Sequence, residues 1–241
     1  MITEKDCLAA ILCFNTVKET KKTLEGIPKE RNYDVLIVND GSTDSTKEII
    51  EQFHFNKIHH ERNKGVGSAI KTAIHYASSH GYKVIAILAG NNKDDPSKLD
   101  RLISPIIKEG FDYVQGSRFL PGGSYDNLPI FRNIMIRLHA FLFFLITGFK
   151  GTDALNGFRA YRLDIFKDSR INIFQDWLDR YELETYIHYK VLKLGYKVKE
   201  VPVSKTYPEN KMNVKYSHIR PIIDWWIILR PLVFLLPGLR K

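Results

Sequence analysis

Cysteine is scarce in this sequence, and its placement narrows the class of protein. Two of the 241 residues are cysteines, Cys7 and Cys13, and both lie in one apolar run. Disulfide-rich secreted domains carry many cysteines in a short chain, so the sequence excludes that class. Cysteines that share one strand do not pair with each other. The sequence therefore favours a reducing compartment.

Long apolar runs are also missing. A helix that spans a bilayer needs about 20 mostly apolar residues, and the two most apolar stretches, residues 138–146 and 222–236, are shorter. Three residues interrupt the second stretch: Asp224, Arg230 and Pro231. Its two tryptophans are Trp225 and Trp226, and the basic residues expected near lipid phosphates are Arg220, Arg230, Arg240 and Lys241. These features predict an amphipathic membrane-interface helix, with a core helix or an oligomer contact as the alternative.

Three other signatures are absent. The N-terminal residues lack the basic start of a secretion signal, so we expect the apolar run that follows to be a buried strand. No Gly-x-Gly-x-x-Gly pattern follows that strand, which argues against a dinucleotide-dependent dehydrogenase. The histidines do not cluster at metal-ligand spacing, and His59 and His60 are expected only to end a strand.

The charge is strongly positive. The formal net charge is +9, with 44% hydrophobic and 26% charged residues, which is typical of a globular domain. Such a charge suits nucleic acid, anionic lipid or a phosphorylated substrate. The basic residues do not interleave with a known nucleic-acid-binding module, so we expect no nucleic-acid partner.

Strand and helix patterns alternate in the first half of the chain. Five β-branched runs predict strands at residues 8–14, 35–39, 57–60, 84–89 and 113–115. Four patterns between them predict helices near residues 18–25, 45–53, 66–78 and 97–108. The alternation predicts an α/β fold with a mostly parallel sheet flanked by helices. Ligands bind such sheets at the C-terminal ends of the strands.

The second half is less regular. It contains an apolar helix at residues 131–147, a helix near 182–194 and a strand at 197–203. We predict one domain over residues 1–215 and a basic, aromatic membrane-interface segment over residues 216–241.

The sharpest motif is the sequence Val-Asn-Asp-Gly-Ser-Thr-Asp-Ser-Thr at residues 38–46. It places Asp40 at the end of a buried strand, where its carboxylate is expected to face the cleft and accept from a base N–H or from ribose hydroxyls. Ser42, Thr43 and Asp44 are expected to cap the next helix. A plain capped turn is the alternative.

This motif resembles the donor-binding turn of family 2 inverting glycosyltransferases, which have the GT-A (Rossmann-like) fold. Six further segments resemble the family in the same order, and the later ones resemble its dolichyl-phosphate mannose synthase, or polyprenyl-phosphate, branch: residues 12–15, 63–69, 116–118, 131–133, 153–161 and 200–203, together with Glu184. Leu12 replaces the usual proline and Thr16 the usual glutamate of the first segment. The resemblance implies a set of donor-binding residues: Cys13, Phe14, Asn15, Asp40, Gly41, Ser42, Lys64 and Gly90.

One family motif is altered. The Asp-x-Asp that holds a divalent cation on the donor diphosphate reads Ala89-Gly90-Asn91 here. Neutral amides are weak ligands for Mg²⁺ or Mn²⁺. Three interpretations stay open: shifted ligands from Asn91, Asp94 and Asp95 hold the metal ion, with Asn91 and Asp94 as the preferred pair; Lys93 replaces the metal ion; or the protein binds without turnover. Asp95 is expected to cap the helix that follows.

The resemblance also implies an acceptor site. Arg118 and Arg132 resemble the family's phosphate-binding arginines, and with Asn91 and Lys93 they form the predicted catalytic set. The remaining predicted acceptor residues are Asp153, Asn156, Arg159 and Glu184. A phosphate acceptor needs cations that hold two anions together, but no general base. A sugar hydroxyl would need a carboxylate base, and the candidates are then Asp153, Asp176 and Glu184.

The resemblance thus implies transfer of a sugar from a UDP- or GDP-sugar to a polyprenyl phosphate, at the cytoplasmic face of a membrane. The apolar side chains Phe141, Phe143 and Phe144 are expected to face the lipid, and the protein to be peripheral or monotopic. Two alternatives stay open: transfer to a hydroxyl of a lipid-linked or surface saccharide, and nucleotide-sugar binding without catalysis. A homo-oligomer also stays open.

Overall fold

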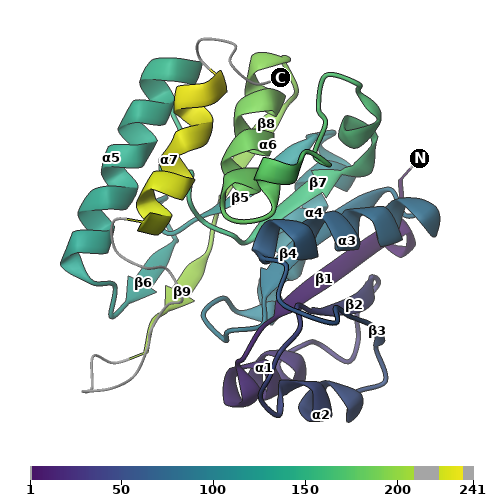
Figure 1. Cartoon of the computed structure of the whole chain (residues 1–241). Coiled ribbons are helices and arrows are strands. Elements are labelled where there is room, and N and C mark those ends of the chain that lie inside the picture. Colours follow the sequence, from purple (N-terminus) through teal and green to yellow (C-terminus); the bar gives the residue numbers. More distant parts are fainter. Residues whose placement is uncertain (1, 209–222, 236–241) are drawn as a thin grey trace.

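A seven-stranded sheet forms the centre of the protein in the computed structural model, which describes residues 2–208 and 223–235 (Figure 1). Across the sheet the strands are β3 (Asn56–His59), β2 (Asp34–Asn39), β1 (Cys7–Cys13), β4 (Val84–Ala89), β7 (Arg159–Arg162), β5 (Tyr113–Ser117) and β8 (Val198–Pro202). All neighbouring pairs are parallel except those of β7, which is antiparallel to β4 and to β5. The predicted α/β, mostly parallel fold is confirmed.

Both faces of this sheet are covered, which explains its apolar strands. Successive side chains of a strand point to opposite faces. In β1, Leu8 and Ala10 pack on one side and Ala9 and Ile11 on the other, and all four are fully buried. Parallel strands buried on two sides are continuously hydrophobic rather than alternating. The apolar N-terminal run is therefore a core strand, as predicted.

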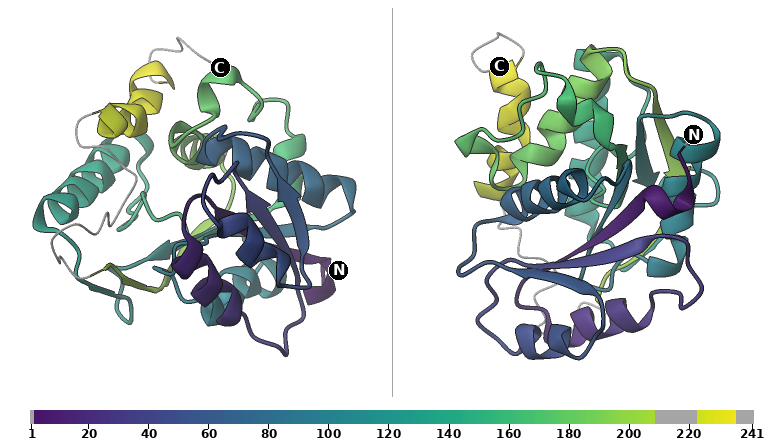
Figure 2. Two further views of the ribbon diagram at one scale, coloured as in Figure 1. Left: turned by 60° about the horizontal axis from the view of Figure 1, so that its bottom comes forward. Right: turned by 90° about the vertical axis from the view of Figure 1, so that its right-hand side faces the viewer.

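The helices divide between the two faces (Figure 2). In the first half they are α1 (Val17–Glu25), α2 (Thr46–Glu51), α3 (Val66–Ser79) and α4 (Leu99–Lys108). The core on one face includes side chains of α3 and of α6 (Glu182–Lys193), and the core on the other includes side chains of α1, α2 and α4. All four helices of the first half lie close to the predicted ranges, and α2 is the shortest of them.

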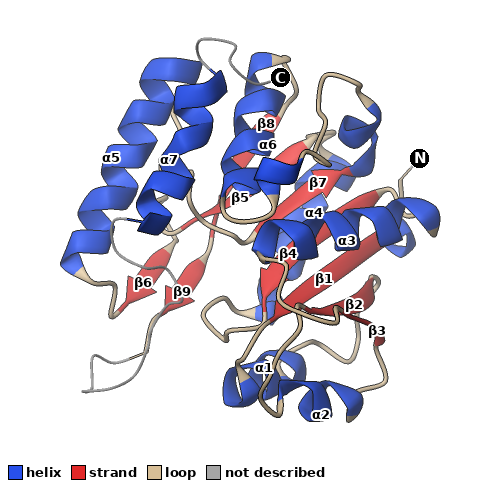
Figure 3. Cartoon of the chain, in the orientation of Figure 1, coloured by secondary structure: helices blue, strands red, loops and turns tan. Residues whose placement is uncertain are grey.

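The second half adds two further helices and a small sheet (Figure 3). Helices α5 (Ile130–Thr147) and α7 (Ile223–Leu235) pack beside α6. Strands β6 (Ser124–Asp126) and β9 (Ser204–Thr206) form a parallel pair of their own. Short 3₁₀ helices lie at Glu4–Asp6, Pro96–Lys98, Leu163–Lys167 and Asp176–Leu178. Strands β6, β7 and β9 were not predicted, because none of these three- and four-residue strands contains a run of β-branched residues.

Helix α7 corrects one prediction about the C-terminal segment. Arg230 was expected near lipid phosphates, but its guanidinium pairs with the buried carboxylate of Glu182 on α6. Ile228 and Leu232 are buried against the domain, whereas Trp226 is exposed. The other residues predicted at the interface, Arg220, Trp225, Arg240 and Lys241, fall outside the residues whose side chains are described. The boundary at residue 216 stays a prediction.

Helix α5 corrects a second prediction. Phe143 was expected to face lipid, but it is buried, and Phe144 is half-buried. The exposed apolar face consists of Ile130, Phe131, Ile134, Leu138, Phe141 and Leu145, at spacings that place them on one side of the helix. By length and composition alone, α5 is the one helix among residues 2–208 and 223–235 that could cross a membrane.

Candidate functional site

A cleft of about 720 Å³ lies at the C-terminal ends of the parallel strands. The end of β1 contributes Cys13 to its wall, the residue after β2 contributes Asp40, and the end of β4 contributes Ala89. This is the position that the strand–helix alternation predicts for a ligand.

Ten of the predicted site residues line this cleft: Cys13, Phe14, Asn15, Asp40, Asn91, Lys93, Arg118, Arg132, Arg159 and Glu184. Seven others are not among the described lining residues: Gly41, Ser42, Lys64, Gly90, Asp94, Asp153 and Asn156. Most of these seven position the residues that do line the cleft, through the contacts described below.

Asp40 holds the turn that begins α3. Its carboxylate oxygens lie 2.7 Å from Nδ1 of His60 and 2.9 Å from Nδ2 of Asn63, and they accept from the main-chain N–H groups of Lys64 at 3.0 Å and Gly65 at 2.8 Å. A carboxylate has about four acceptor positions, so the chain itself fills them. Asp40 lines the cleft, as predicted, where it was expected to accept from a base N–H or from ribose hydroxyls. Here it fixes the wall of the cleft instead, and Lys64 contributes its backbone while its side chain is exposed.

Ser42 and Thr43 do not cap α2, contrary to prediction. Ser42 Oγ donates to Asn39 at 2.6 Å and accepts from the N–H of Asn15 at 3.0 Å. The N–H of Thr43 donates to Oδ1 of Asn15 at 2.8 Å. These bonds join the end of β1 to the turn after β2 and hold Asn15 in a left-handed conformation, with φ of 49°. The predicted cap by Asp44 is confirmed, because its Oδ1 accepts from the N–H of Thr46 at 3.0 Å.

Two predicted glycines act through close packing. Gly41 has φ of +67°, and a Cβ there would lie 2.2 Å from the carbonyl carbon of Arg62. A Cβ on Gly90 would lie 2.5 Å from Sγ of Cys13. A side chain at either position would displace the walls around Asp40 and Cys13, so these glycines shape the cleft from behind its surface.

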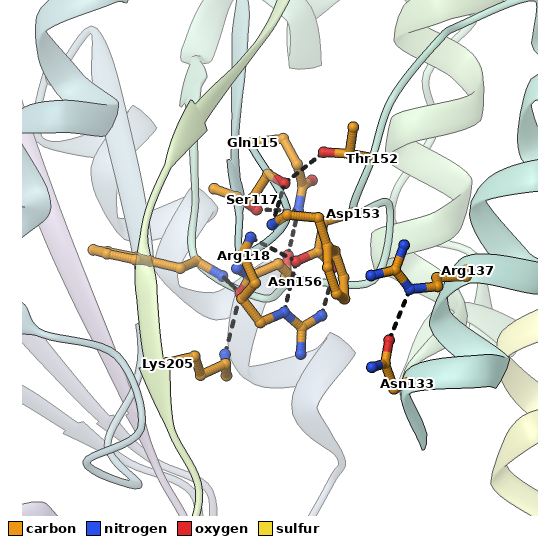
Figure 4. Close-up of polar contacts among 12 residues, drawn as sticks. Gln115, Ser117, Arg118, Asn133, Arg137, Thr152, Asp153, Asn156 and Lys205 are labelled. Atoms are coloured by element: carbon orange, nitrogen blue, oxygen red, sulfur yellow. Dashed lines mark hydrogen bonds and ion pairs between the residues drawn. The ribbon is translucent and has the colours of Figure 1, made fainter. Parts of the chain in front are cut away.

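Arg118 and Asp153 form a buried bidentate ion pair (Figure 4). Nε and Nη2 of Arg118 lie 2.6 and 2.5 Å from the two carboxylate oxygens, and Asp153 is 0% exposed. Burial alone lowers the pKa of Arg118, but the charge and hydrogen bonds of Asp153 outweigh it and raise that pKa. Asp153 therefore fixes and charges Arg118, and it is not placed to act as the base for a sugar hydroxyl.

Glu200 and Asn156 hold in place the segment that carries Asp153. Glu200 Oε1 accepts from the N–H of Asp153 at 2.9 Å, and its Oε2 accepts from the N–H of Thr152 at 2.8 Å. The main-chain oxygen of Asn156 accepts from Gln115 Nε2 at 2.6 Å. These contacts tie the segment that carries Asp153 to β5 and β8.

Arg159 forms part of the floor of the cleft. It is 1% exposed, and its Nε donates to the main-chain oxygen of Asn156 at 2.7 Å and lies 3.3 Å from Oε1 of Glu184. Burial alone lowers the pKa of Arg159, but Glu184 and, after it, Tyr113 and Tyr161 together outweigh burial and raise that pKa. Arg159 and Glu184 therefore pair with each other at the floor of the cleft.

A cluster of cations surrounds the ring of Tyr207. Lys93 Nζ lies 5.6 Å and Arg132 Cζ 5.5 Å from the ring centroid, and the Tyr207 hydroxyl also accepts from Arg118. Lys205 Nζ lies 2.6 Å from Oδ2 of Asp94 and 3.1 Å from Oδ1 of Asn156. Burial, and after it the charges of Arg132 and Lys205, lowers the pKa of Lys93 to about 7. A bound anion here would favour the charged form of Lys93.

Lys205 and Tyr207 were not predicted as site residues. They lie in and just after the short strand β9, and no motif or periodicity marks them. Arg180, which also lines the cleft, was missed for the same reason. Of the described residues that line the cleft, six are basic and three are acidic. The cleft is therefore suited to an anionic ligand.

The residues after β4 do not fit a divalent cation. Oδ1 of Asn91 accepts from the N–H of Lys93 at 3.2 Å, and Asp94 is buried with its Oδ2 paired to Lys205. Oδ1 of Asp94 is left as a single buried oxygen without a hydrogen-bond partner in the described part of the chain. Asp95 caps the following turn through the N–H of Ser97 at 2.9 Å, as predicted. Among the described residues no three His, Cys, Asp or Glu side chains gather where they could hold a metal ion.

Known proteins resemble this chain over most of its length. Residues 9–170 match the model of the family described as glycosyl transferase family 2. A UDP-N-acetylglucosamine–dolichyl-phosphate N-acetylglucosaminyltransferase of Methanococcus voltae is 30% identical, over 84% of this chain and 86% of that protein. An undecaprenyl-phosphate mannosyltransferase of Micrococcus luteus is 25% identical, over 86% and 87%. The fold matches glucosyl-3-phosphoglycerate synthase of Mycobacterium tuberculosis, crystallised with Mn²⁺, UDP and phosphoglyceric acid, with a TM-score of 0.68 and 14% identity over 96% and 77%.

Proposed function

The chain belongs to glycosyltransferase family 2, and we propose that it transfers a sugar, with inversion, from a nucleotide sugar to a polyprenyl phosphate. The family makes the protein a glycosyltransferase with the GT-A fold. The acceptor is inferred from relatives named for dolichyl and undecaprenyl phosphate. The observation that carries it is the pair Arg118 and Arg132, which line the cleft beside further cations.

In the proposed reaction a phosphate oxygen of the acceptor attacks the anomeric carbon of the sugar. The bond between that carbon and the donor diphosphate breaks, and the nucleoside diphosphate leaves with the electron pair. No proton has to move, because the phosphate is already an anionic nucleophile. The protein must instead hold two anions in line against their repulsion, which fixed cations accomplish.

Arg118 and Arg132 are proposed to hold the acceptor phosphate. The hydrogen bonds of Arg118 to Asp153 and Tyr207 use three of the five N–H groups of its guanidinium, and Asp153 keeps it charged and rigid. Arg132 lies in the first turn of α5, close in sequence to the exposed side chains Ile130, Phe131 and Ile134. A lipid phosphate arriving along that helix would meet Arg132 first.

The donor is proposed to lie along the ends of β1 and β2. Phe14 and Asn15 line this end of the cleft, which Asp40 stabilises from behind. UDP- and GDP-sugars both remain candidates. The fold neighbour was crystallised with Mn²⁺ and UDP, but Asn91 and Asp94 are engaged within this chain, so no step is assigned to a metal ion.

The carboxylates suggested for a hydroxyl acceptor are poorly placed as a general base. Asp153 is buried against Arg118, Asp176 is exposed and is not among the described lining residues, and Glu184 pairs with Arg159. A hydroxyl acceptor needs one of them to accept a proton. The phosphate acceptor is therefore favoured.

We propose that the exposed apolar face of α5 lies in the membrane interface on the cytoplasmic side, together with the segment 216–241. Six large apolar side chains on one side of a helix suit a monotopic contact. Self-association through the same face is the alternative outcome of the membrane-binding test given below.

The function is tested by transfer from a panel of radiolabelled UDP- and GDP-sugars to undecaprenyl phosphate in detergent. Undecaprenol, which lacks the phosphate, is the matched control acceptor. The proposal is supported if labelled lipid forms from undecaprenyl phosphate and none forms from undecaprenol. Equal transfer to both, or transfer only to a saccharide hydroxyl, overturns it. A protein that binds nucleotide sugar and never turns over would be the non-catalytic alternative.

A further inference from the structure

The loop after β4 lies in the middle of the cleft. In the sheet, β4 stands between β1 and β7, and β5 follows β7. Phe14 and Asn15, at the end of β1, line one side, and Arg118, just after β5, lines the other. A donor whose nucleoside lies at β1 and whose sugar meets an acceptor at Arg118 must place its diphosphate beside this loop.

This loop is held by the distant strand β9. The N–H of Thr206 donates to the main-chain oxygen of Lys93 at 2.9 Å, and Asp94 and Lys205 form an antiparallel bridge. The Lys205 ammonium then reaches Asp94 and Asn156. Lys93, on this loop, and Lys205, on β9, therefore both line the cleft on backbone that is fixed before any ligand binds.

Resting on the proposed function, we propose that Lys93 and Lys205 bind the diphosphate of the nucleotide sugar directly, in place of the divalent cation that the family motif would hold. Two acceptor groups that could have served a cation are engaged within the chain: Oδ1 of Asn91 accepts from the backbone of Lys93, and Oδ2 of Asp94 pairs with Lys205. Oδ1 of Asp94 is the one oxygen of this pair of side chains that is buried without a hydrogen-bond partner among the described residues, and a single oxygen is a weak site for a divalent cation. Lys93 and Arg132 lie over the ring of Tyr207, and Lys205 pairs with Asp94. The carboxylates whose charges act on Lys93 are Asp94 and Glu19. Fixed cations at this place stabilise the charge that develops on the leaving diphosphate.

The first test measures the affinity of the purified protein for UDP and for GDP by calorimetry, in excess EDTA and again with Mn²⁺ or Mg²⁺. The inference expects one of the two nucleotides to bind in EDTA with an affinity within about threefold of that with the metal ion. Binding that disappears in EDTA and returns with Mn²⁺ overturns it, as does a protein that binds neither nucleotide in EDTA.

The second test uses charge-removing variants in EDTA. Lys93→Met is expected to weaken nucleotide binding at least about tenfold, the loss of one hydrogen bond between charged groups, whereas Lys93→Arg retains most of the affinity. Lys205→Met is made together with Asp94→Asn, so that no unpaired carboxylate is buried. Lys47→Met, on the exposed side of α2, is the matched control.

Thermal unfolding of each variant shows that it is folded. The inference is overturned if the variants Lys93→Met and Lys205→Met/Asp94→Asn are folded and bind UDP or GDP as tightly as the wild type. No acceptor is present in these measurements. Metal-free nucleotide binding without transfer to undecaprenyl phosphate would therefore count against the proposed acceptor alone and support the diphosphate site.

Discussion

The ammonium of Lys205 lies 2.6 Å from Oδ2 of Asp94, although the two residues are far apart in the sequence. Asp94 is one of the residues on which a metal ion was predicted. The ion pair gives its carboxylate a partner from β9 and brings a second lysine beside Lys93. One tertiary contact thus changes the expected chemistry of the loop after β4.

Loss of the Asp153 carboxylate is expected to destabilise the fold. Asp153→Asn leaves the guanidinium of Arg118 buried without its counter-charge, and breaking such a pair costs about 3–5 kcal/mol. Urea denaturation measures the change in the free energy of unfolding. Asp176→Asn, at an exposed position, is the control. A change below about 1 kcal/mol for Asp153→Asn would show that the pair contributes little.

Arg132→Met is expected to act on the acceptor. The KM for undecaprenyl phosphate should rise at least about tenfold, because one charged hydrogen bond to the phosphate is lost. The Kd for UDP or GDP should change much less. Arg137→Met, on the exposed side of the same helix, serves as the control. Equal effects of the two substitutions on KM would remove Arg132 from the acceptor site.

Asp40→Ala is expected to abolish tight nucleotide binding through the turn that it holds. Without the carboxylate, the N–H groups of Lys64 and Gly65 lose their acceptor, at a cost of about 1–3 kcal/mol in stability. Asp44→Ala removes only a helix cap, worth about 1 kcal/mol, and should bind nucleotide normally. Calorimetry with UDP and GDP compares the two variants. Unchanged affinity in Asp40→Ala would separate this turn from the donor site.

Charges on the exposed face of α5 are expected to weaken membrane binding. Ile134→Glu with Phe141→Glu places two carboxylates on the apolar face, and cosedimentation with anionic phospholipid vesicles should fall several-fold. Phe174→Glu, at an exposed phenylalanine on another part of the surface, is the control. Unchanged vesicle binding, together with loss of an oligomer in ultracentrifugation, would assign the face to self-association.

The stability of the fold is expected to decrease in acid through two buried histidines. Burial first, and then the charge of Arg159, lowers the pKa of His139 from 6.5 to about 3 and that of His188 well below 6.5. The rings of Phe143 and His188 contact each other, and those of Tyr113 and Phe149 also contact His188. Below pH 6.5 these two histidines bind protons in the unfolded chain but stay neutral in the folded chain. The two neutral histidines therefore contribute fully to the free energy of unfolding above pH 6.5, and this contribution is lost progressively as the pH falls toward 3.

Each of these histidines adds up to about 1.4 kcal/mol of destabilisation per pH unit in that window. Urea denaturation at pH 7 and pH 5 measures it. His139→Phe should reduce the difference between the two pH values, whereas His54→Phe, at an exposed position, should leave it unchanged. An equal pH dependence in wild type and His139→Phe would contradict this account.

The sequence by itself determined the features that depend on neighbours in the chain. The apolar strand Cys7–Cys13, the periodic helix Val66–Ser79 and the caps made by Asp44 and Asp95 follow from local spacing and side-chain chemistry. The family resemblance, which rests on motifs at strand ends, could also be recognised from the sequence, and it is confirmed. These features were predictable because a strand or helix repeats every few residues, and a cap needs only the next turn.

Only the tertiary structure decided how charges pair and which sides are buried. Apolar residues occur on every side of the helix at Ile130–Thr147, so the sequence could not tell that Phe143 faces the core and Phe141 the outside. Arg230 joins Glu182, and Lys205 joins Asp94, because packing brings distant segments together. An ion pair depends on atoms within a few ångströms, and spacing along the chain carries no information about that distance once the chain has folded back on itself.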